Sequence, residues 1–251
     1  MARGTYMDRT IKALVLREVK YKEADRILTV LTTDGKLTVK APGALRKNSK
    51  CAAATQQLTL SELSIYARMS HWQVREGTVL ESFAGLRMDL ENLSIAVYIA
   101  QVLEAVADED AANPALLQLG LNSLYALSEQ LAEGWLIKAV FELRLACIAG
   151  YAPELTGCVH CGAEEGPQYF DHREGGLVCR SCGGYGTPLS EACLAAMRHV
   201  VYAPAKKIFS FTLSGEARKE FAGHCEKYLL TQLDRSFSTL DYYKQIRITQ
   251  I

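Results

Sequence analysis

The chain has 251 residues, 49% of them apolar, and its 28 Lys and Arg residues balance 28 Asp and Glu residues. The length suits one large domain or two to three small ones, and the six prolines and absence of low-complexity tracts indicate an ordinary soluble protein. The first ten residues lack the apolar core of a signal peptide, and no apolar run reaches the roughly 18 residues of a membrane span. These features exclude a membrane protein and predict a cytoplasmic one.

The zero net charge conceals an uneven distribution. Residues 1–80 carry 14 Lys and Arg against 7 Asp and Glu, residues 81–150 carry 3 against 10, and residues 151–251 carry 11 against 11. A basic amino-terminal third favours an anionic partner, with nucleic acid as the leading candidate. The alternative is a solvated face with scattered lysines.

This basic third has the pattern of β-strands. Five short β-branched or alternating runs are separated by turns, at residues 11–17, 27–31, 37–41, 58–66 and 72–80. Asp34-Gly35 predicts a tight hairpin between the second and third runs, because glycine accepts a positive φ. Five strands in so short a segment are typical of a Greek-key barrel of the OB type, a common platform for single-stranded nucleic acid.

A basic loop, residues 41–50, separates the third and fourth predicted strands. It opens with Pro42-Gly43 and contains no acid, so its cations can reach phosphates without base-specific geometry. The candidate DNA-binding residues, on this loop and on the strands, are Lys12, Arg26, Lys36, Lys40, Arg46, Lys47 and Lys50. Tyr66 and Trp72 are candidate stacking faces, although the position of Trp72 at a strand start favours the core.

From residue 86 the apolar period changes to that of helices. Helices are predicted from about residue 86 to 100, from the cap Asn113 with Pro114 to residue 131, and from 135 to 148. The last of these is apolar nearly all round and should be the buried centre of a helical bundle. Two further helices are expected after the caps Ser190 and Ser214, and residues 237–251 are expected to be mixed and partly disordered.

Between these helices lie two Cys-x-x-Cys motifs, Cys158 with Cys161 and Cys179 with Cys182, separated by the 17 residues 162–178. This spacing predicts a four-thiolate zinc site, and a full cysteine shell leaves no position for substrate, so one structural Zn²⁺ per chain is expected. A redox pair is the weaker alternative.

Other residues bear on this site. His160 and His172 could replace a ligand but are more typical of a hairpin surface. Gly162 and Gly183 suit the sharp turns after the second cysteine of each motif. The remaining cysteines are expected to be small buried hydrophobes, namely Cys51, Cys147, Cys193 and Cys225.

The expected fold is therefore α+β and multidomain. It comprises a five-stranded OB-fold barrel at residues 1–82, a helical domain at 83–153 and 187–251, and an inserted four-cysteine, zinc-ribbon-like segment at 154–186. Walker loops, His-Glu-x-x-His motifs and nucleophile elbows are absent from the sequence, which argues against an enzyme.

Two stretches resemble the RecO family of bacterial recombination mediators. They are residues 141–162, with a Gly-Tyr-x-Pro turn before the first cysteine motif, and residues 23–50. In this resemblance the four cysteines match the zinc positions, and Arg46, Lys47 and Lys50 match the basic loop. The loop has fewer arginines than is usual in the family.

The resemblance implies a non-enzymatic, nucleoid-associated DNA repair protein. Such proteins bind single- and double-stranded DNA, anneal complementary strands, and act with RecR to load RecA onto DNA coated by single-strand-binding protein, whose tail they also bind. The alternative, from the residues alone, is a zinc-containing protein-interaction adaptor or transcription factor without annealing activity.

Overall fold

The computed structural model describes residues 8–68, 71–109, 111–166, 168–186 and 188–249. By density of contacts the chain divides into two compact units, residues 1–129 with 237–251 and residues 130–236. The three-domain division predicted from the sequence stays a prediction. The expected lack of a signal peptide concerns residues 1–10, and the first seven of these lie outside the described residues.

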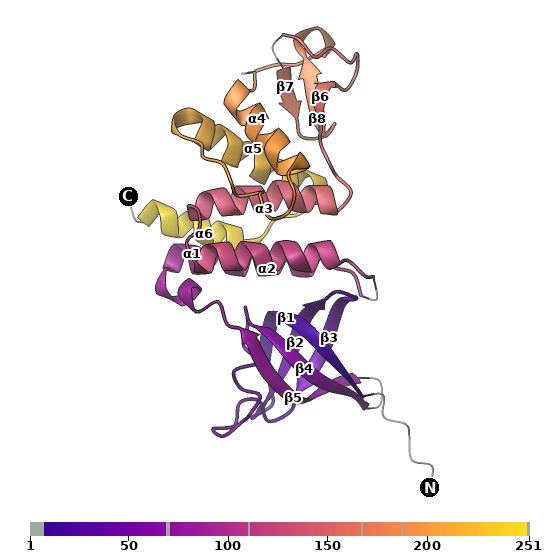
Figure 1. Cartoon of the computed structure of the whole chain (residues 1–251), viewed down its shortest axis with the longest axis vertical. Helices are drawn as coiled ribbons and strands as arrows, with labels where there is room; N and C mark the ends of the chain where they lie inside the picture. Colours follow the sequence, from indigo (N-terminus) through magenta and orange to yellow (C-terminus); the bar gives the residue numbers. More distant parts are fainter. Residues whose placement is uncertain (1–7, 69–70, 110, 167, 187, 250–251) are drawn as a thin grey trace. The chain divides into compact units, whose positions relative to one another are not determined.

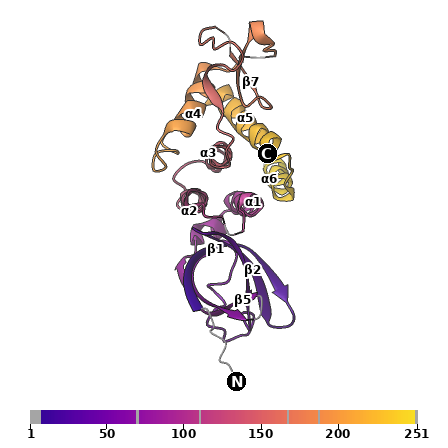
Figure 2. The ribbon, with the colours of Figure 1, turned by 90° about the vertical axis from the view of Figure 1, so that its right-hand side faces the viewer.

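The first unit contains the closed five-stranded barrel that the sequence predicts (Figures 1 and 2). Its strands are β1 (Asp8–Tyr21), β2 (Asp25–Thr32), β3 (Gly35–Ala41), β4 (Leu60–Arg68) and β5 (His71–Glu81). They follow the order β1-β2-β3-β5-β4, antiparallel except for the β3–β5 pair. β1 pairs with β4 through its first half and with β2 through its second, and an irregularity between Val15 and Arg17 marks the change. One long strand thereby closes the barrel.

The barrel interior is filled by alternating apolar side chains. Its cluster includes Ala13, Val15, Leu28, Val30, Val39, Leu63 and Ile65. Leu14 and Leu16 interrupt the alternation, since both are also buried. They face away from the interior, and helices of the same unit pack on this side of β1.

The hairpin between β2 and β3 is confirmed, but the predicted turn position is one residue late. Thr32 pairs with Gly35, so Thr33 and Asp34 form the turn. Gly35 has a φ of 120°, and an added Cβ would lie 2.8 Å from the carbonyl oxygen of Asp108. Glycine is therefore required by backbone conformation and by close packing.

Within its described residues, the first unit also contains η1 (Ala84–Met88), α1 (Leu90–Val106), α2 (Pro114–Ser128) and α6 (Ser238–Thr249). Asn113 caps α2 by accepting a hydrogen bond from the Leu116 N–H, as predicted. α2 ends at Ser128, three residues earlier than expected.

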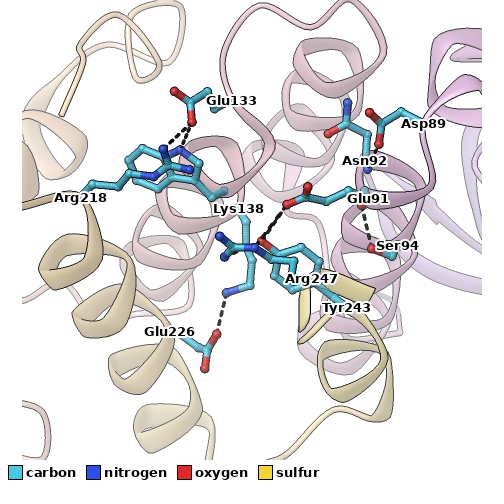
Figure 3. Close-up of polar contacts among 11 residues, drawn as sticks. Asp89, Glu91, Asn92, Ser94, Glu133, Lys138, Arg218, Glu226, Tyr243 and Arg247 are labelled. Carbon is cyan, nitrogen blue, oxygen red and sulfur yellow. Dashed lines mark hydrogen bonds and ion pairs between the residues drawn. The ribbon is translucent and has the colours of Figure 1, made fainter. Parts of the chain in front are cut away.

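The prediction of partial disorder near the carboxyl terminus is wrong for residues 238–249, which form α6; residues 250–251 lie outside the described residues. The buried residues Phe237, Leu240, Tyr243 and Ile246 recur every three positions. They form one face of a helix that packs against α1. Arg247 also forms an ion pair with Glu91, at 3.6 Å (Figure 3).

The second unit consists of three helices and a small sheet. The helices are α3 (Gly134–Ile148), α4 (Glu191–Tyr202) and α5 (Gly215–Leu233). The sheet contains β6 (Glu154–Cys158), β7 (Gln168–Asp171) and β8 (Gly176–Cys179) in the order β6-β8-β7, and η2 (Arg180–Cys182) follows it. Ser190 caps α4 as predicted, whereas Ser214 makes no capping hydrogen bond at α5.

α3 is buried, as expected from its composition, and packs against α4 and α5. It also buries two charged residues. Lys138 lies 2.7 Å from Glu142 one turn away. It also lies 2.8 Å from Glu226 of α5 (Figure 3). Although burial lowers the pKa of Lys138, the two carboxylates raise it above its ordinary value, so the amine stays charged. None of the helices in the described residues has the length and apolar character that crossing a membrane requires.

Candidate nucleic-acid interface and thiolate cluster

A groove of about 620 Å³ lies on the outside of the barrel where β3 meets β5, and we call it the barrel groove. Its lining residues include Tyr21, Lys36, Lys40, His71, Trp72 and Gln73. Val39 pairs with Trp72 and Lys40 with Gln73 across the parallel strands, which brings two predicted cations beside a predicted aromatic residue. The groove thus combines aromatic faces with two lysines, and Glu109 is the acid among its described lining residues.

The predicted strand cations have different surroundings. Lys40 forms an ion pair with Asp25 at 2.8 Å, and the Lys36 ammonium donates a hydrogen bond to the Glu104 carbonyl at 2.9 Å. Hydrogen bonds from Lys40 and from the Gly43 backbone N–H lower the pKa of Asp25. Lys12 is exposed and lies opposite Glu62 on β4. It does not line the barrel groove.

Arg26 is mostly buried, with 12% of its side chain exposed. Its guanidinium donates hydrogen bonds to the Ala52 carbonyl and to the Thr55 hydroxyl, both at 2.8 Å, and lies 3.4 Å from Glu18. These contacts fix the segment that follows the basic loop. The guanidinium of Arg26 therefore points into the protein and holds this segment in position.

The basic loop is anchored at its start. Asp25 accepts a hydrogen bond from the Gly43 N–H at 2.8 Å, and the Leu45 N–H donates to the Ala24 carbonyl at 2.9 Å. Successive turns follow, and Ala44 and Ala54 insert into the barrel core. The exposed residues between these anchors include Arg46, Lys47 and Lys50. Their side chains reach solvent from a backbone that is held in place.

Aromatic residues border the barrel groove. Tyr21 is 41% exposed, and the Lys40 ammonium lies 5.1 Å from its ring centroid. Trp72 is half-buried, packs against the barrel core and also lines the groove, so the core and stacking interpretations both describe part of it. Tyr66 donates a hydrogen bond to Gln73 and does not line this groove. Tyr21 was not among the residues predicted from the sequence, although its position between Lys20 and Lys22 indicates an aromatic ring beside positive charge.

In the second unit the four predicted ligands come together. The sulfur atoms of Cys158, Cys161, Cys179 and Cys182 all lie within 4.8 Å of one another. The Cys161 and Cys179 sulfurs are 3.7 Å apart. A tetrahedral site with metal–sulfur bonds of about 2.3 Å has sulfur–sulfur edges of about 3.8 Å. The cluster fits a metal ion.

Local backbone geometry aims these sulfurs at one point. Gly162 and Gly183 have φ values of 74° and 106°, as their predicted role in the two turns requires. Among the thiols, backbone hydrogen bonds lower the pKa of Cys158 to about 6, while hydrogen bonds with neighbouring thiols raise that of Cys182 to about 12. The neighbouring thiols therefore oppose ionisation of Cys182, and a bound divalent cation would remove this opposition.

No histidine belongs to the cluster among the residues that the structure describes. His160 is exposed, as expected, and His172 is partly exposed in the β7–β8 turn, where its ring stacks on His224 of α5. Of the other cysteines, Cys193 and Cys225 are buried as predicted, whereas Cys51 and Cys147 are only half-buried. Burial raises the pKa of Cys193 to about 12, which makes its thiol unreactive.

Comparison with known proteins gives matches along nearly the whole chain. Residues 7–83 match the family described as recombination protein O N terminal, and residues 87–241 match recombination protein O C terminal. Among curated relatives, the DNA repair protein RecO of Acetivibrio thermocellus is 33% identical over 238 residues, covering 93% of this chain and 95% of the relative. The DNA repair protein RecO of Bacillus pumilus is 30% identical over 221 residues, covering 86% of each.

Proposed function

The chain belongs to the RecO family of DNA repair and recombination proteins, and from this we propose that it is a non-enzymatic recombination mediator. In this role it binds single- and double-stranded DNA and anneals complementary strands. With RecR it helps to load RecA onto DNA coated by single-strand-binding protein, whose tail is a further partner. The observation that carries the proposal is the family match over both halves of the chain.

The barrel groove supports the DNA-binding part of this proposal. It places Tyr21 and Trp72 beside Lys36 and Lys40 of β3, which is one of the two strands whose face OB folds use for oligonucleotides. Aromatic faces stack on unpaired bases of any sequence, and cations alongside attract the phosphates. Such a surface suits a protein that acts on DNA of every sequence.

The basic loop supplies a second group of phosphate contacts in this proposal. Arg46, Lys47 and Lys50 are exposed, and the anchored backbone reduces the conformational entropy that binding would cost. Arg26 contributes by holding residues 52–55 behind the loop.

We assign the thiolate cluster to one structural Zn²⁺. Four thiolates at tetrahedral spacing are the donor set that zinc prefers, and they leave no coordination position for water or substrate. The ion would stabilise the fold of the second unit and take no part in a chemical step.

The test is fluorescence anisotropy with a labelled single-stranded oligonucleotide at several salt concentrations. Replacing Arg46, Lys47 and Lys50 together by alanine should weaken binding and flatten the slope of log K against log salt by about 2, at about 0.7 for each lost phosphate contact. The matched control removes three exposed cations from the second unit: Lys206, Lys207 and Arg235.

An unchanged salt slope in the loop variant would remove the basic loop from the interface. If the wild-type protein itself fails to bind at low salt, the mediator proposal fails. The adaptor alternative would then be favoured, and it predicts partner proteins that are retained after DNA removal.

A further inference from the structure

A second groove, of about 580 Å³, lies wholly within the second unit, and we call it the ribbon groove. Its walls come from β7, from residues 183–185 after the last cysteine, and from α5. Its volume is within the range of sites that bind small ligands or a nucleotide. Nothing in the family match or in the proposed barrel interface accounts for it.

Part of the ribbon groove is a pair of imidazoles. His224 Nδ1 lies 3.1 Å from His172 Nε2, and the rings stack at 14° with centroids 5.1 Å apart. Burial, followed by the nearby charges of His224 and Lys227, lowers the pKa of His172 to about 4. Both rings are therefore neutral at pH 7, which gives the groove a flat, uncharged aromatic lining that retains hydrogen-bonding nitrogen atoms.

Two cations accompany this pair. Arg173 and Lys227 are exposed, and within the described part of the chain neither forms an ion pair. Asp171 is the one acid among the described residues that line the groove. Its carboxylate accepts hydrogen bonds from the backbone N–H groups of Arg173 and Glu174, at 2.8 and 3.0 Å. The Asp171 carboxylate is thus engaged by the backbone of its own turn, and the side chains of Arg173 and Lys227 remain available to a ligand.

The remaining feature is an exposed aromatic ring. Tyr185 is 84% exposed, although tyrosine commonly buries most of its ring. An added Cβ on Gly184 would lie 2.4 Å from the Tyr169 ring, so the chain just before Tyr185 is packed tightly against β7. A tyrosine next to a fixed segment offers a stacking face at low entropic cost.

We propose that the ribbon groove binds one nucleotide unit of a single-stranded nucleic acid, with Arg173 and Lys227 contacting phosphate and Tyr185 stacking on the base. This contact rests on the proposed DNA-binding function and adds a site outside the barrel. Flat rings beside unpaired cations are the combination that binds single strands without sequence preference. A peptide that binds by strand addition would need a free strand edge, but β7 has only four residues and the Gln168 carbonyl already accepts a hydrogen bond from the Leu189 N–H.

The first test is photocrosslinking of the full-length protein to a single-stranded oligonucleotide that carries 5-iododeoxyuridine, a base that crosslinks to stacked aromatic rings. The expected product is a crosslink in the tryptic peptide 181–198, which contains Tyr185. Crosslinks confined to barrel peptides would overturn the proposal.

The second test is the salt-dependent anisotropy titration. Replacing Arg173 and Lys227 by alanine should flatten the salt slope by about 1.4, at about 0.7 per phosphate, and Tyr185→Ala should weaken binding about five-fold or more at constant salt. The matched controls remove two positive charges and one exposed tyrosine outside the groove. They are Lys206→Ala with Lys207→Ala, and Tyr202→Ala, whose tyrosine is 62% exposed. Unchanged metal content and circular dichroism establish that the variants are folded.

Groove variants that match their controls, in a protein that binds DNA normally, would overturn this proposal and leave the proposed function intact. Loss of affinity for a labelled oligoglutamate peptide, with DNA affinity unchanged, would identify a peptide site and also overturn it. A wild-type protein without DNA affinity would overturn both proposals.

Discussion

The barrel and the β6–β8 sheet are two β structures in one chain that are stabilised differently. The barrel surrounds a cluster of twelve buried apolar residues. Among the described residues, the cluster around the thiols contains Cys158, Val178 and Cys179, two of which are predicted metal ligands, while the other buried apolar residues of this sheet are Leu155, Tyr169, Phe170 and Leu177. Hydrophobic burial can maintain the barrel, whereas three residues around the thiols add little apolar burial to offset the conformational entropy of the two cysteine turns.

We propose that a metal ion held by the thiolate cluster stabilises the turns that contain the cysteines. Bound zinc contributes on the order of 10 kcal/mol to the folding of small domains, comparable with the whole stability of a typical domain. The glycines after each cysteine motif permit the sharp turns that bring the sulfurs together. Stability of the barrel should then be independent of metal, and stability of the second unit should depend on it.

The largest expected effect comes from breaking the thiolate cluster. Cys179→Ser should release the metal and destabilise the second unit, because the lost binding energy is on the order of 10 kcal/mol. Metal content by mass spectrometry and calorimetry check this together. The barrel transition should stay in place while the second-unit transition shifts or disappears.

Two variants complete this test. Cys147→Ser removes a half-buried thiol from the same unit and should keep the metal. Leu63→Ala removes a fully buried side chain from the barrel core and should lower the barrel transition alone, by about 2–5 kcal/mol. If Cys179→Ser keeps its unfolding temperature, the structural role of the metal is wrong.

The features that could be predicted from the sequence are those that local patterns determine. The cysteine motifs and barrel strands are short-range patterns, and their positions could be found from spacing and alternation. The partners of Arg26 and Lys40 depend on strand register and on a loop far along the chain, so composition predicted both as DNA contacts without detecting their internal partners. The terminal helix α6 did carry a local signal, the three-residue spacing of Phe237, Leu240 and Tyr243, which its many polar residues obscured.

A smaller effect should come from the buried charges of α3. Lys138→Ala leaves the fully buried Glu142 without its cation and should destabilise the second unit by about 3–5 kcal/mol. The chain has two tryptophans, so a Trp72→Phe background leaves Trp135 of α3 as the reporter in urea denaturation. The double variant Lys138→Met with Glu142→Leu should recover most of the loss, because it removes the unpaired charge. Equal instability of both variants would show that packing, not charge, is responsible.

The smallest expected effect is a pH dependence confined to the second unit. Burial lowers the pKa of His224 and lowers that of His172 to about 4, whereas an unfolded histidine has a pKa of about 6.5. The unfolded chain therefore binds more protons between these values, so stability is complete above pH 6.5 and falls as the pH drops toward 4. Because both rings are partly exposed, the loss should be on the order of 1 kcal/mol.

The charged groups that act on the pair are Asp171 from β7 and Glu220 and Lys227 from α5. Acid also protonates the thiolates, so the measurement is the difference in urea stability between wild type and His224→Gln at pH 7 and pH 5. That difference should shrink at pH 5, because the variant has lost one of the titrating rings. His199→Gln, on α4, serves as the control and should follow the wild type at both pH values. A parallel pH response in His224→Gln would show that His224 does not contribute to the acid sensitivity, which would leave the thiolates and His172 as its sources in the second unit.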